Sequence, residues 1–221
     1  MPLTIAIDGP VGAGKSTISD AVAKKLDILH LDTGAMYRAF GLYAIESGVD
    51  TLDEAALSDL IKAAEISVKY ENGRQSTLVN GRDVTTLIRT PEVSMAASNV
   101  SRFPAVRKQM VRLAQETAKG QSILLDGRDI GTVVLKDATV KIYLTASPEV
   151  RAKRRHLELL QKGSADSFEK VLAELKARDE QDMNRATDPL KQADDAVLVD
   201  TSNLDFEQSV RAILTVVEAK K

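Results

Sequence analysis

The segment from Leu3 to Thr17, LTIAIDGPVGAGKST, constrains the fold more than any other part of the chain. A short, largely apolar run is followed by the full pattern G-x-x-x-x-G-K-[S/T], and the residues after Lys15 have apolar side chains at helical spacing. Glycines between a strand and a helix let backbone N–H groups turn toward phosphate oxygens, and the helix N-terminus adds a partial positive charge. The chain is therefore predicted to bind a compound that carries several phosphates.

The residue types in this loop suit a nucleoside triphosphate. Lys15 can reach the β- and γ-phosphates, and the hydroxyl of Ser16 can bind Mg²⁺. Thr17 is expected to touch the α-phosphate or to cap the loop locally. A glycine-rich turn without a ligand is the alternative, and the complete pattern between a strand and a helix argues against it. We expect the nucleotide to be bound by Gly9, Pro10, Val11, Gly12, Ala13, Gly14, Lys15, Ser16 and Thr17.

Composition excludes several functions. The chain has 221 residues, with 30 Lys and Arg against 32 Asp and Glu, and the net charge of -2 argues against a nucleic-acid or anionic-membrane surface. It has no cysteine, which rules out disulfides and thiolate metal sites, and its 2 histidines are too few for a histidine-rich zinc site. The N-terminus lacks a basic stretch and Asp8 interrupts the apolar run, so we expect no signal peptide or membrane span. A monomer in the cytoplasm is expected.

Strand-like and helix-like segments alternate along most of the chain, which indicates a parallel sheet with right-handed crossovers. We expect strands at 3–8, 28–32, 122–125, 139–145 and 196–199. We expect helices at 15–26, through Tyr37 to near Gly48, at 54–64, from Pro91 to Gly120 with a break at Phe103-Pro104, at 148–162, 167–184 and 205–219.

Residues 50–90 interrupt that alternation. Asn72-Gly73 and Asn80-Gly81 are hairpin-turn signals flanked by β-favouring residues, so this stretch is predicted to be a small antiparallel insertion. A second excursion is expected at about 155–165, around the break at Gly163. The prediction is an α/β fold in which a five-stranded parallel sheet, flanked by helices, carries two excursions.

Three classes of protein share the phosphate-binding loop. Regulatory GTPases recognise guanine with N-K-x-D, which this chain lacks. Motor ATPases usually have a long apolar strand that ends in an acidic pair, and SILLDGRD at 122–129 matches this only in part. Small-molecule kinases need a second anion-binding lobe and a lid, and the two excursions are candidates for both.

Phosphoryl transfer to an acceptor that is itself a phosphate has a particular requirement. Since a phosphate monoester has a second pKa of about 6, the acceptor is already an anion and needs no general base. The obstacle is repulsion between the two anions, and arginines, whose planar forks grip pairs of phosphate oxygens, are suited to reduce it. Such a site should be rich in arginine and poor in catalytic histidine or cysteine, as this sequence is.

Two groups of arginines have helical spacing. Arg151, Arg154 and Arg155 lie at i, i+3 and i+4, where the alternative is a solvated basic face. A second group has the spacing i, i+4 and i+7, where the alternative is a ladder of ion pairs within one helix: Arg178, Asp182 and Arg185. Taken with the loop, both groups favour a site that closes on a donor and an acceptor.

Six segments, in the same order, resemble the bacterial cytidylate kinases: IAIDGPVGAGKST, LDTGAMYRA, FPAVR, LLDGRDIGTVV, KIYLTASPEVRAKRR and RDEQDMNRATDPL. The resemblance spans nearly the whole chain, and DGRDIGTVV and R-D-x-x-D-x-x-R-x-x-x-P-L are its most specific parts. It implies a phosphate-loop (P-loop) NTPase fold and the reaction of ATP with CMP or dCMP to give ADP and CDP or dCDP, with Mg²⁺. The implied partners are these nucleotides, without nucleic acid or membrane.

The resemblance also implies roles for individual residues. Asp129, Ser98 and Arg107 would bind the cytosine, and Asp182 with Arg178 the ribose. The acceptor phosphate would be bound by Arg38, Arg128 and Arg185, in a pocket that includes Thr33 and Tyr37. The expected catalytic residues are Lys15, Arg128, Arg154, Arg155 and Arg185. Ser16 would bind Mg²⁺; Asp32 is either the cap of the next helix or a carboxylate behind the ligands of that ion.

The expected organisation is a single P-loop kinase domain over 1–221. Its core would comprise about 1–49, 100–153 and 180–221, with an acceptor-nucleotide insert at about 50–99 and a short helical lid at about 154–179. Two other functions stay open from the residues alone: a related kinase for UMP or shikimate, and a nucleotide-gated switch that hydrolyses ATP or GTP slowly.

Overall fold

The protein is described by a computed structural model that covers residues 2–71, 73–161 and 163–221. Its central element is a sheet of five parallel strands in the order β2-β6-β1-β7-β8. The strands are β1 (Thr4–Asp8), β2 (Leu29–Asp32), β6 (Ile123–Gly127), β7 (Val140–Thr145) and β8 (Val197–Asp200). The α/β fold and the five predicted strands are confirmed, and β1, which leads into the glycine-rich loop, lies in the middle of the sheet.

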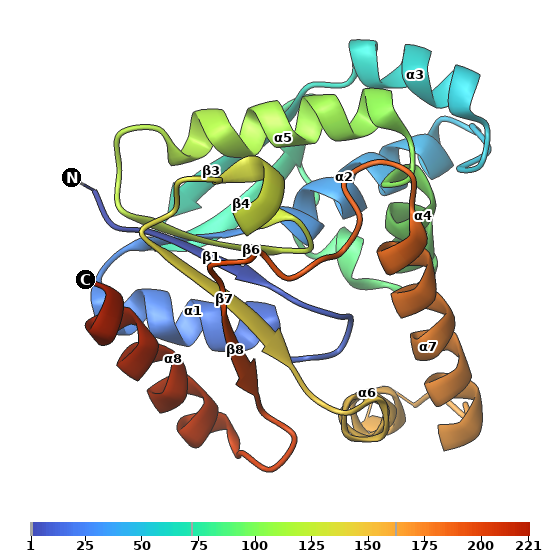
Figure 1. Cartoon of the computed structure of the whole chain (residues 1–221). Coiled ribbons are helices and arrows are strands. Elements are labelled where there is room, and N and C mark those ends of the chain that lie inside the picture. The colour runs from blue at the N-terminus through green and yellow to red at the C-terminus, as the bar shows by residue number, and fades with distance from the viewer. Residues whose placement is uncertain (1, 72, 162) are drawn as a thin grey trace.

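Helices cover both faces of this sheet (Figure 1). The helices are α1 (Lys15–Leu26), α2 (Thr33–Glu46), α3 (Glu54–Ala63), α4 (Pro91–Val100), α5 (Pro104–Ala118), α6 (Pro148–Gln161), α7 (Phe168–Asn184) and α8 (Phe206–Lys220). Side chains alternate across β1: Ile5 and Ile7 pack with α1 and α8, whereas Ala6 packs on the opposite side with α2 and α5. None of the described helices is long and apolar enough to cross a membrane.

Residues 50–90 form the predicted antiparallel insertion. Its sheet has three strands in the order β3-β4-β5, namely β3 (Ile66–Glu71), β4 (Arg74–Val79) and β5 (Arg82–Asp83), followed by the 3-10 turn η1 (Leu87–Arg89). Asn80 and Gly81 both have positive φ, at 49° and 78°, as the tight turn from β4 to β5 requires. The other predicted turn includes Asn72, which lies outside the described residues. The sequence pattern did not predict β5 or η1, which are too short for a periodic signal.

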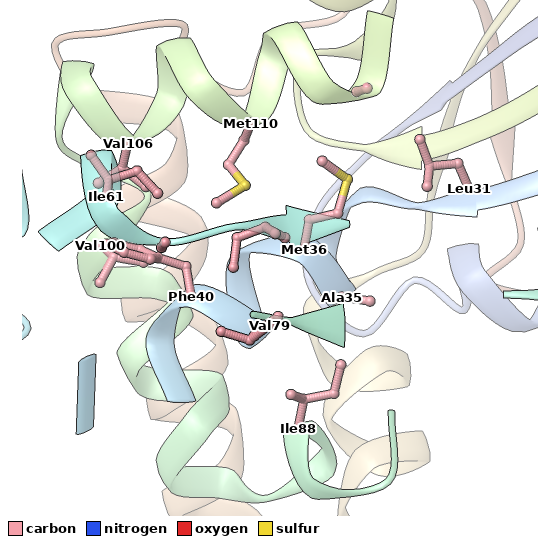
Figure 2. Packing of buried hydrophobic residues seen from close by; sticks show 14 of the residues in the cluster. Leu31, Ala35, Met36, Phe40, Ile61, Val79, Ile88, Val100, Val106 and Met110 are labelled. Carbon is pink, nitrogen blue, oxygen red and sulfur yellow. The ribbon is translucent and has the colours of Figure 1, made fainter. Parts of the chain in front are cut away.

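The insertion shares its hydrophobic core with one face of the main sheet. Phe40 of α2 is fully buried, and Figure 2 shows around it side chains from the insertion (Ile61, Val79 and Ile88) and from α5 (Met110). Since these residues form one continuous cluster, the insertion is held against the sheet by apolar packing as well as by polar contacts.

Two local features lie near the carboxyl edge of the sheet. Residues after β6 form a π-helical turn, η2 (Ile130–Val134), which sequence periodicity did not predict. The predicted helices at 148–162 and 167–184 correspond to α6 and α7, which pack against each other and against the start of the glycine-rich loop. Lys162, the predicted last residue of the first of them, lies outside the described residues.

Candidate active site

The glycine-rich loop between β1 and α1 is fixed by its backbone geometry. Gly9, Gly12 and Gly14 have φ values of 153°, 74° and 86°, in the region that side chains disfavour. At Gly9 a Cβ atom would lie 2.0 Å from the carbonyl oxygen of Leu144 in β7, so even alanine would force two neighbouring strands apart. The loop therefore takes the shape that its glycines predicted.

Lys15 lies inside this loop. Its Nζ donates hydrogen bonds to the carbonyl oxygens of Gly9 and Pro10, at 2.8 and 2.7 Å. Burial lowers the pKa of Lys15 to about 7, and the positive charge of Arg128 contributes to the shift. A nearby anion would stabilise the charged form of this poorly solvated lysine, in the place of the lost water.

The hydroxyl of Ser16 meets a carboxylate at the end of a neighbouring strand. Ser16 Oγ donates to Asp126 Oδ2 at 2.8 Å, and His30 Nε2 donates to Asp126 Oδ1 at 2.7 Å. Burial alone would lower the pKa of His30, but the hydrogen bond and charge of Asp126 outweigh it and raise that pKa. One carboxylate thus links the loop to β2.

These oxygens suit a magnesium ion that is bound mainly by a nucleotide. Mg²⁺ prefers oxygen ligands and is usually held by one or two protein groups together with substrate phosphates. Ser16 and Asp126 supply such oxygens beside Lys15, whereas the described residues contain no cluster of three His, Asp or Glu that would hold a metal without the nucleotide. The donor set therefore fits the predicted ion.

We expect His30 to act as a positioning residue for Asp126. His30→Leu should lower kcat and weaken the apparent affinity for Mg²⁺ by about 10-fold or more, because Asp126 loses the donor that orients it. His30→Gln, which restores an N–H donor, should recover most of the loss. Kinetics over a Mg²⁺ titration, with Mn²⁺ binding in the presence of ATP followed by electron paramagnetic resonance, would measure both. Unchanged metal dependence in His30→Leu would contradict the assignment.

Asp8 holds the segment that follows β6. Its two carboxylate oxygens accept the backbone N–H groups of Ile130 and Gly131, at 2.7 and 2.8 Å, which fixes the start of η2 beside Asp129. Burial raises the pKa of Asp8 to about 6, although those two hydrogen bonds oppose the shift.

The raised pKa of Asp8 predicts a loss of stability with rising pH. The folded protein binds the proton more tightly than the unfolded chain, so the free energy of unfolding should fall as the pH rises from about 4 to about 6. With the pKa of Asp8 raised to about 6, this contribution is about 3 kcal/mol. Urea denaturation at several pH values should show a steeper fall in the wild type than in Asp8→Asn, which keeps the contribution of Asp129, whose pKa burial also raises. Parallel profiles would contradict it.

Helices α6 and α7 are tied to the glycine-rich loop through Val11. The Val11 N–H donates to Asp179 Oδ1 at 3.1 Å, and its carbonyl oxygen accepts from Arg151 Nη1 at 2.8 Å. Arg151 also pairs with Asp179 at 2.6 Å, and both side chains are buried. Of the predicted basic face of α6, Arg151 is thus the residue that contacts the loop.

A group of arginines gathers beside the loop. Burial lowers the pKa of Arg178, and the charges of Arg128, Arg38 and Arg155 lower it further, which places these three guanidinium groups within electrostatic reach of Arg178. Among the described residues, the buried Nε of Arg178 has no hydrogen-bond partner. The arginines come from α2, the segment after β6, α6 and α7, elements that are distant in sequence. Such a concentration of positive charge is suited to bind phosphate.

Two aspartates partly balance this charge. Asp182 Oδ2 accepts from Arg128 Nε at 2.8 Å, and Asp32 Oδ2 accepts from Arg38 Nη2 at 2.7 Å. Asp32 Oδ1 accepts the N–H of Ala35, so the predicted helix-capping role of Asp32 is present. Although burial opposes it, the nearby arginines lower the pKa of Asp32.

A second cluster surrounds Asp129. Arg107, which is fully buried, donates a hydrogen bond from Nη2 to Asp129 Oδ2 and pairs through Nε with Asp188 at 2.9 Å. Arg185 Nη2 donates to Asp129 Oδ1 at 3.2 Å. The guanidinium of Arg107 lies 5.9 Å from the ring centre of Tyr37, and burial raises the pKa of Tyr37 to about 12. This cluster combines fixed donors, a carboxylate and an aromatic wall.

Ser98 and Thr33 are buried at the edges of these clusters. Gln181 of α7 donates through Nε2 to Ser98 Oγ at 2.9 Å, and Thr33 Oγ1 donates to the carbonyl oxygen of Asp126 at 2.8 Å. The residues predicted for an acceptor pocket therefore surround the carboxyl edge of the sheet next to the loop.

Some predicted residues have contacts other than those expected. Arg154 donates to the carbonyl oxygen of Thr201 at 2.8 Å rather than to the loop, and Arg155 pairs with Glu158 at the surface. Arg185 contacts Asp129, in the cluster assigned to the base, and Asp182 pairs with Arg128. Sequence reasoning did not select Asp8, Asp126, Asp179, Gln181 or Asp188 as contact residues of the site, and it selected Arg151 as part of a basic helical face without predicting its contact with Val11. Asp126 and Asp179 stand inside the motifs DGRD and RDEQD, which was the available signal.

The five-stranded parallel sheet and the glycine-rich loop together define the class of the protein as a phosphate-loop NTPase fold. A shikimate kinase from Bacteroides thetaiotaomicron has the same fold, with a TM-score of 0.51, 13% sequence identity and coverage of 98% of both chains. A family model described as cytidylate kinase matches residues 5–219. The chain belongs to the cytidylate kinase family.

Curated relatives match over almost the whole chain. The cytidylate kinase of Thermosipho melanesiensis is 48% identical over 220 residues, which is 100% of this chain and 99% of the relative. That of Caldicellulosiruptor bescii is 47% identical over 212 residues, 96% of this chain and 94% of the relative.

Proposed function

We propose that this protein transfers the γ-phosphoryl group of ATP to CMP or dCMP, giving ADP and CDP or dCDP. Membership of the cytidylate kinase family supports this reaction. The observation that carries the mechanism is the closeness of Lys15, in the loop, to Arg128, in the arginine group: the charge of Arg128 contributes to the low pKa of Lys15. Donor and acceptor phosphates would therefore meet between these two residues.

The chemistry relies on positioned charge. The acceptor phosphate would be bound by Arg38, Arg128 and Arg185, and Lys15 would neutralise charge on the β- and γ-phosphates. No side chain needs to remove a proton, because the acceptor is already a dianion near neutral pH. Transfer is then an in-line displacement between oxygens that these cations hold together. The proposed catalytic roles of Arg154, Arg155 and Arg185 would need these side chains to leave Thr201, Glu158 and Asp129.

Ser16 and Asp126 would hold Mg²⁺ with the donor nucleotide. When bound, the ion would neutralise charge between the β- and γ-phosphates. Asp32 already accepts hydrogen bonds from Ala35 and from two arginines, so the carboxylate near the ion would be that of Asp126 rather than that of Asp32.

Recognition of cytosine would come from the cluster around Asp129. The exocyclic amine of cytosine is a donor, whereas its O2 and N3 are acceptors. Asp129 can accept from the amine, and Arg107 and Ser98 can donate to the acceptors. Asp182 and Arg178 would bind the ribose hydroxyls in addition to their contacts with the arginine group.

We further propose a division of labour within the single domain. Residues of about 50–99 would enlarge the acceptor side, and about 154–179 would form a lid built from parts of α6 and α7. The protein is proposed to act as a monomer in the cytoplasm on small nucleotides, without nucleic acid or membrane.

A panel of acceptors tests this proposal. ADP release from Mg²⁺-ATP should depend on CMP or dCMP, be weaker with UMP and be absent with shikimate. ATP or GTP hydrolysis at a rate independent of any acceptor would instead support a nucleotide-gated switch. Turnover with shikimate or a preference for UMP would identify a related kinase and overturn the proposal.

A further inference from the structure

Arg89 stands at the point where the insertion returns to the main fold. It is the last residue of η1, between Ile88, which is fully buried, and Thr90, whose Oγ1 accepts the N–H of Val93 and caps α4. The backbone on both sides is therefore fixed. The side chain of Arg89, in contrast, is 53% exposed, and its Nη1 lies 3.3 Å from Asp32 Oδ2.

Arg89 shares that carboxylate oxygen with Arg38. Arg38 Nη2 donates to the same Oδ2 atom at 2.7 Å, so the two guanidinium groups lie side by side. Arg38 belongs to the arginine group around Arg178. Arg89 is thus a neighbour of the proposed acceptor-phosphate site, although it comes from the insertion and lies outside the motifs that identify the family.

The pairing leaves an excess of positive charge. In the parts of the chain that the structure describes, Asp32 is the only acid in an ion pair with either arginine, so one carboxylate faces two guanidinium groups. The side chain of Asp32 is held in place and cannot move closer to either arginine. Its Oδ1 accepts the N–H of Ala35, and its backbone N–H and carbonyl both bond to the side-chain amide of Gln75.

Attachment of the insertion does not require Arg89. Gln75 already links β4 to the end of β2, and Ile88 is packed in the shared core. The longer of the two bonds to Asp32 is that of Arg89, which is also the more exposed side chain. At present Arg89 shares the single negative charge of Asp32 with Arg38. A phosphate dianion bound beside Arg38 would offer Arg89 a partner that carries more negative charge.

We propose that Arg89 is a further ligand of the acceptor phosphate, exchanging its contact with Asp32 for a phosphate oxygen when a nucleoside monophosphate binds. The inference rests on the proposed function, since it deepens the description of that same site. It assigns to the insertion a direct contact with the group that receives the phosphoryl, in addition to any effect on the shape of the pocket.

Binding of CMP and of cytidine, compared by calorimetry, tests the assignment. Arg89→Ala should weaken CMP binding by about 10- to 100-fold, the value of a charge-assisted hydrogen bond, and change cytidine binding by less than about twofold. Arg89→Lys, which keeps the charge without the fork, should lie between the wild type and Arg89→Ala. A phosphate-dependent loss is what separates a ligand from a structural contact.

Arg82→Ala is the matched control. Arg82 is also an arginine of the insertion, is 56% exposed and pairs with Glu46 at 3.0 Å. The Arg82→Ala variant should bind CMP and cytidine as tightly as the wild type does. Equal losses for CMP and cytidine in Arg89→Ala, or no loss for either, would overturn the assignment. If the wild type itself neither bound nor phosphorylated CMP, the proposed function would fail instead, so the two failures are distinguishable.

Discussion

Replacing Lys15 by methionine should lower kcat for CMP phosphorylation by about 10²–10³-fold, the cost of removing one charge-stabilising group from a transition state. Lys15 is the cation of the glycine-rich loop, and its ammonium lies against the carbonyl oxygens of Gly9 and Pro10. Methionine fills a similar volume without a charge. The KM for CMP should change little, because the acceptor is bound by the arginine group.

Stability separates this catalytic effect from misfolding. Burial disfavours the charged form of Lys15, so Lys15→Met should unfold at the same temperature as the wild type or higher. Lys24→Met, on the exposed side of α1 where Lys24 pairs with Asp20, should retain full activity. A Lys15→Met variant with a near-normal kcat would show that the lysine does not act on the reacting phosphates.

Asp129→Ala is expected to destabilise the protein by about 3–5 kcal/mol, as removing one partner of a buried ion pair does. Asp129 is the carboxylate between Arg107 and Arg185, and its loss would leave the fully buried Arg107 with Asp188 as its remaining acid. Thermal unfolding should move down by roughly 10 °C for a chain of this length. Asp59→Ala, which breaks an exposed pair with Lys62, should change the unfolding temperature little.

Asp129→Asn distinguishes recognition from stability. Asparagine keeps the shape and one acceptor, so the destabilisation should be smaller, and kinetics can be measured on folded protein. The kcat/KM for CMP should fall more than that for UMP, because only cytosine carries the amine that the carboxylate would accept from. Equal losses for the two substrates would mean that Asp129 acts by holding Arg107 and Arg185 rather than by contacting the base.

Local patterns predicted most of the fold. The apolar spacing after Gly14 predicted α1 with its observed bounds of Lys15 and Leu26, and Pro91 and Pro104 marked the starts of α4 and α5. These features depend on residues that are close together in the sequence, so they can be recognised from one sequence alone. The π-helical turn η2 was missed because it is stabilised from a distance, by the carboxylate of Asp8.

The site was predicted less completely, because its contacts join residues far apart in the chain. Nothing near Arg107 in sequence indicates that Asp129 and Asp188 will enclose it. Helical spacing placed Arg151 and Arg154 on one face, but small differences in direction send one to the loop and the other to Thr201. Residue types could therefore be selected from motifs, whereas their pairings required the fold.

The bonds on both sides of the Val11 peptide have a consequence for inhibition. Its N–H donates to Asp179 of α7 and its carbonyl oxygen accepts from Arg151 of α6. A displacement of either helix is therefore expected to move the loop. A compound bound between α6 and α7 would rotate the Val11 peptide. It would thereby deform the glycine-rich loop without occupying the nucleotide site. We expect such a compound to need no likeness to a nucleotide, and to escape competition from the high ATP concentration of a living cell.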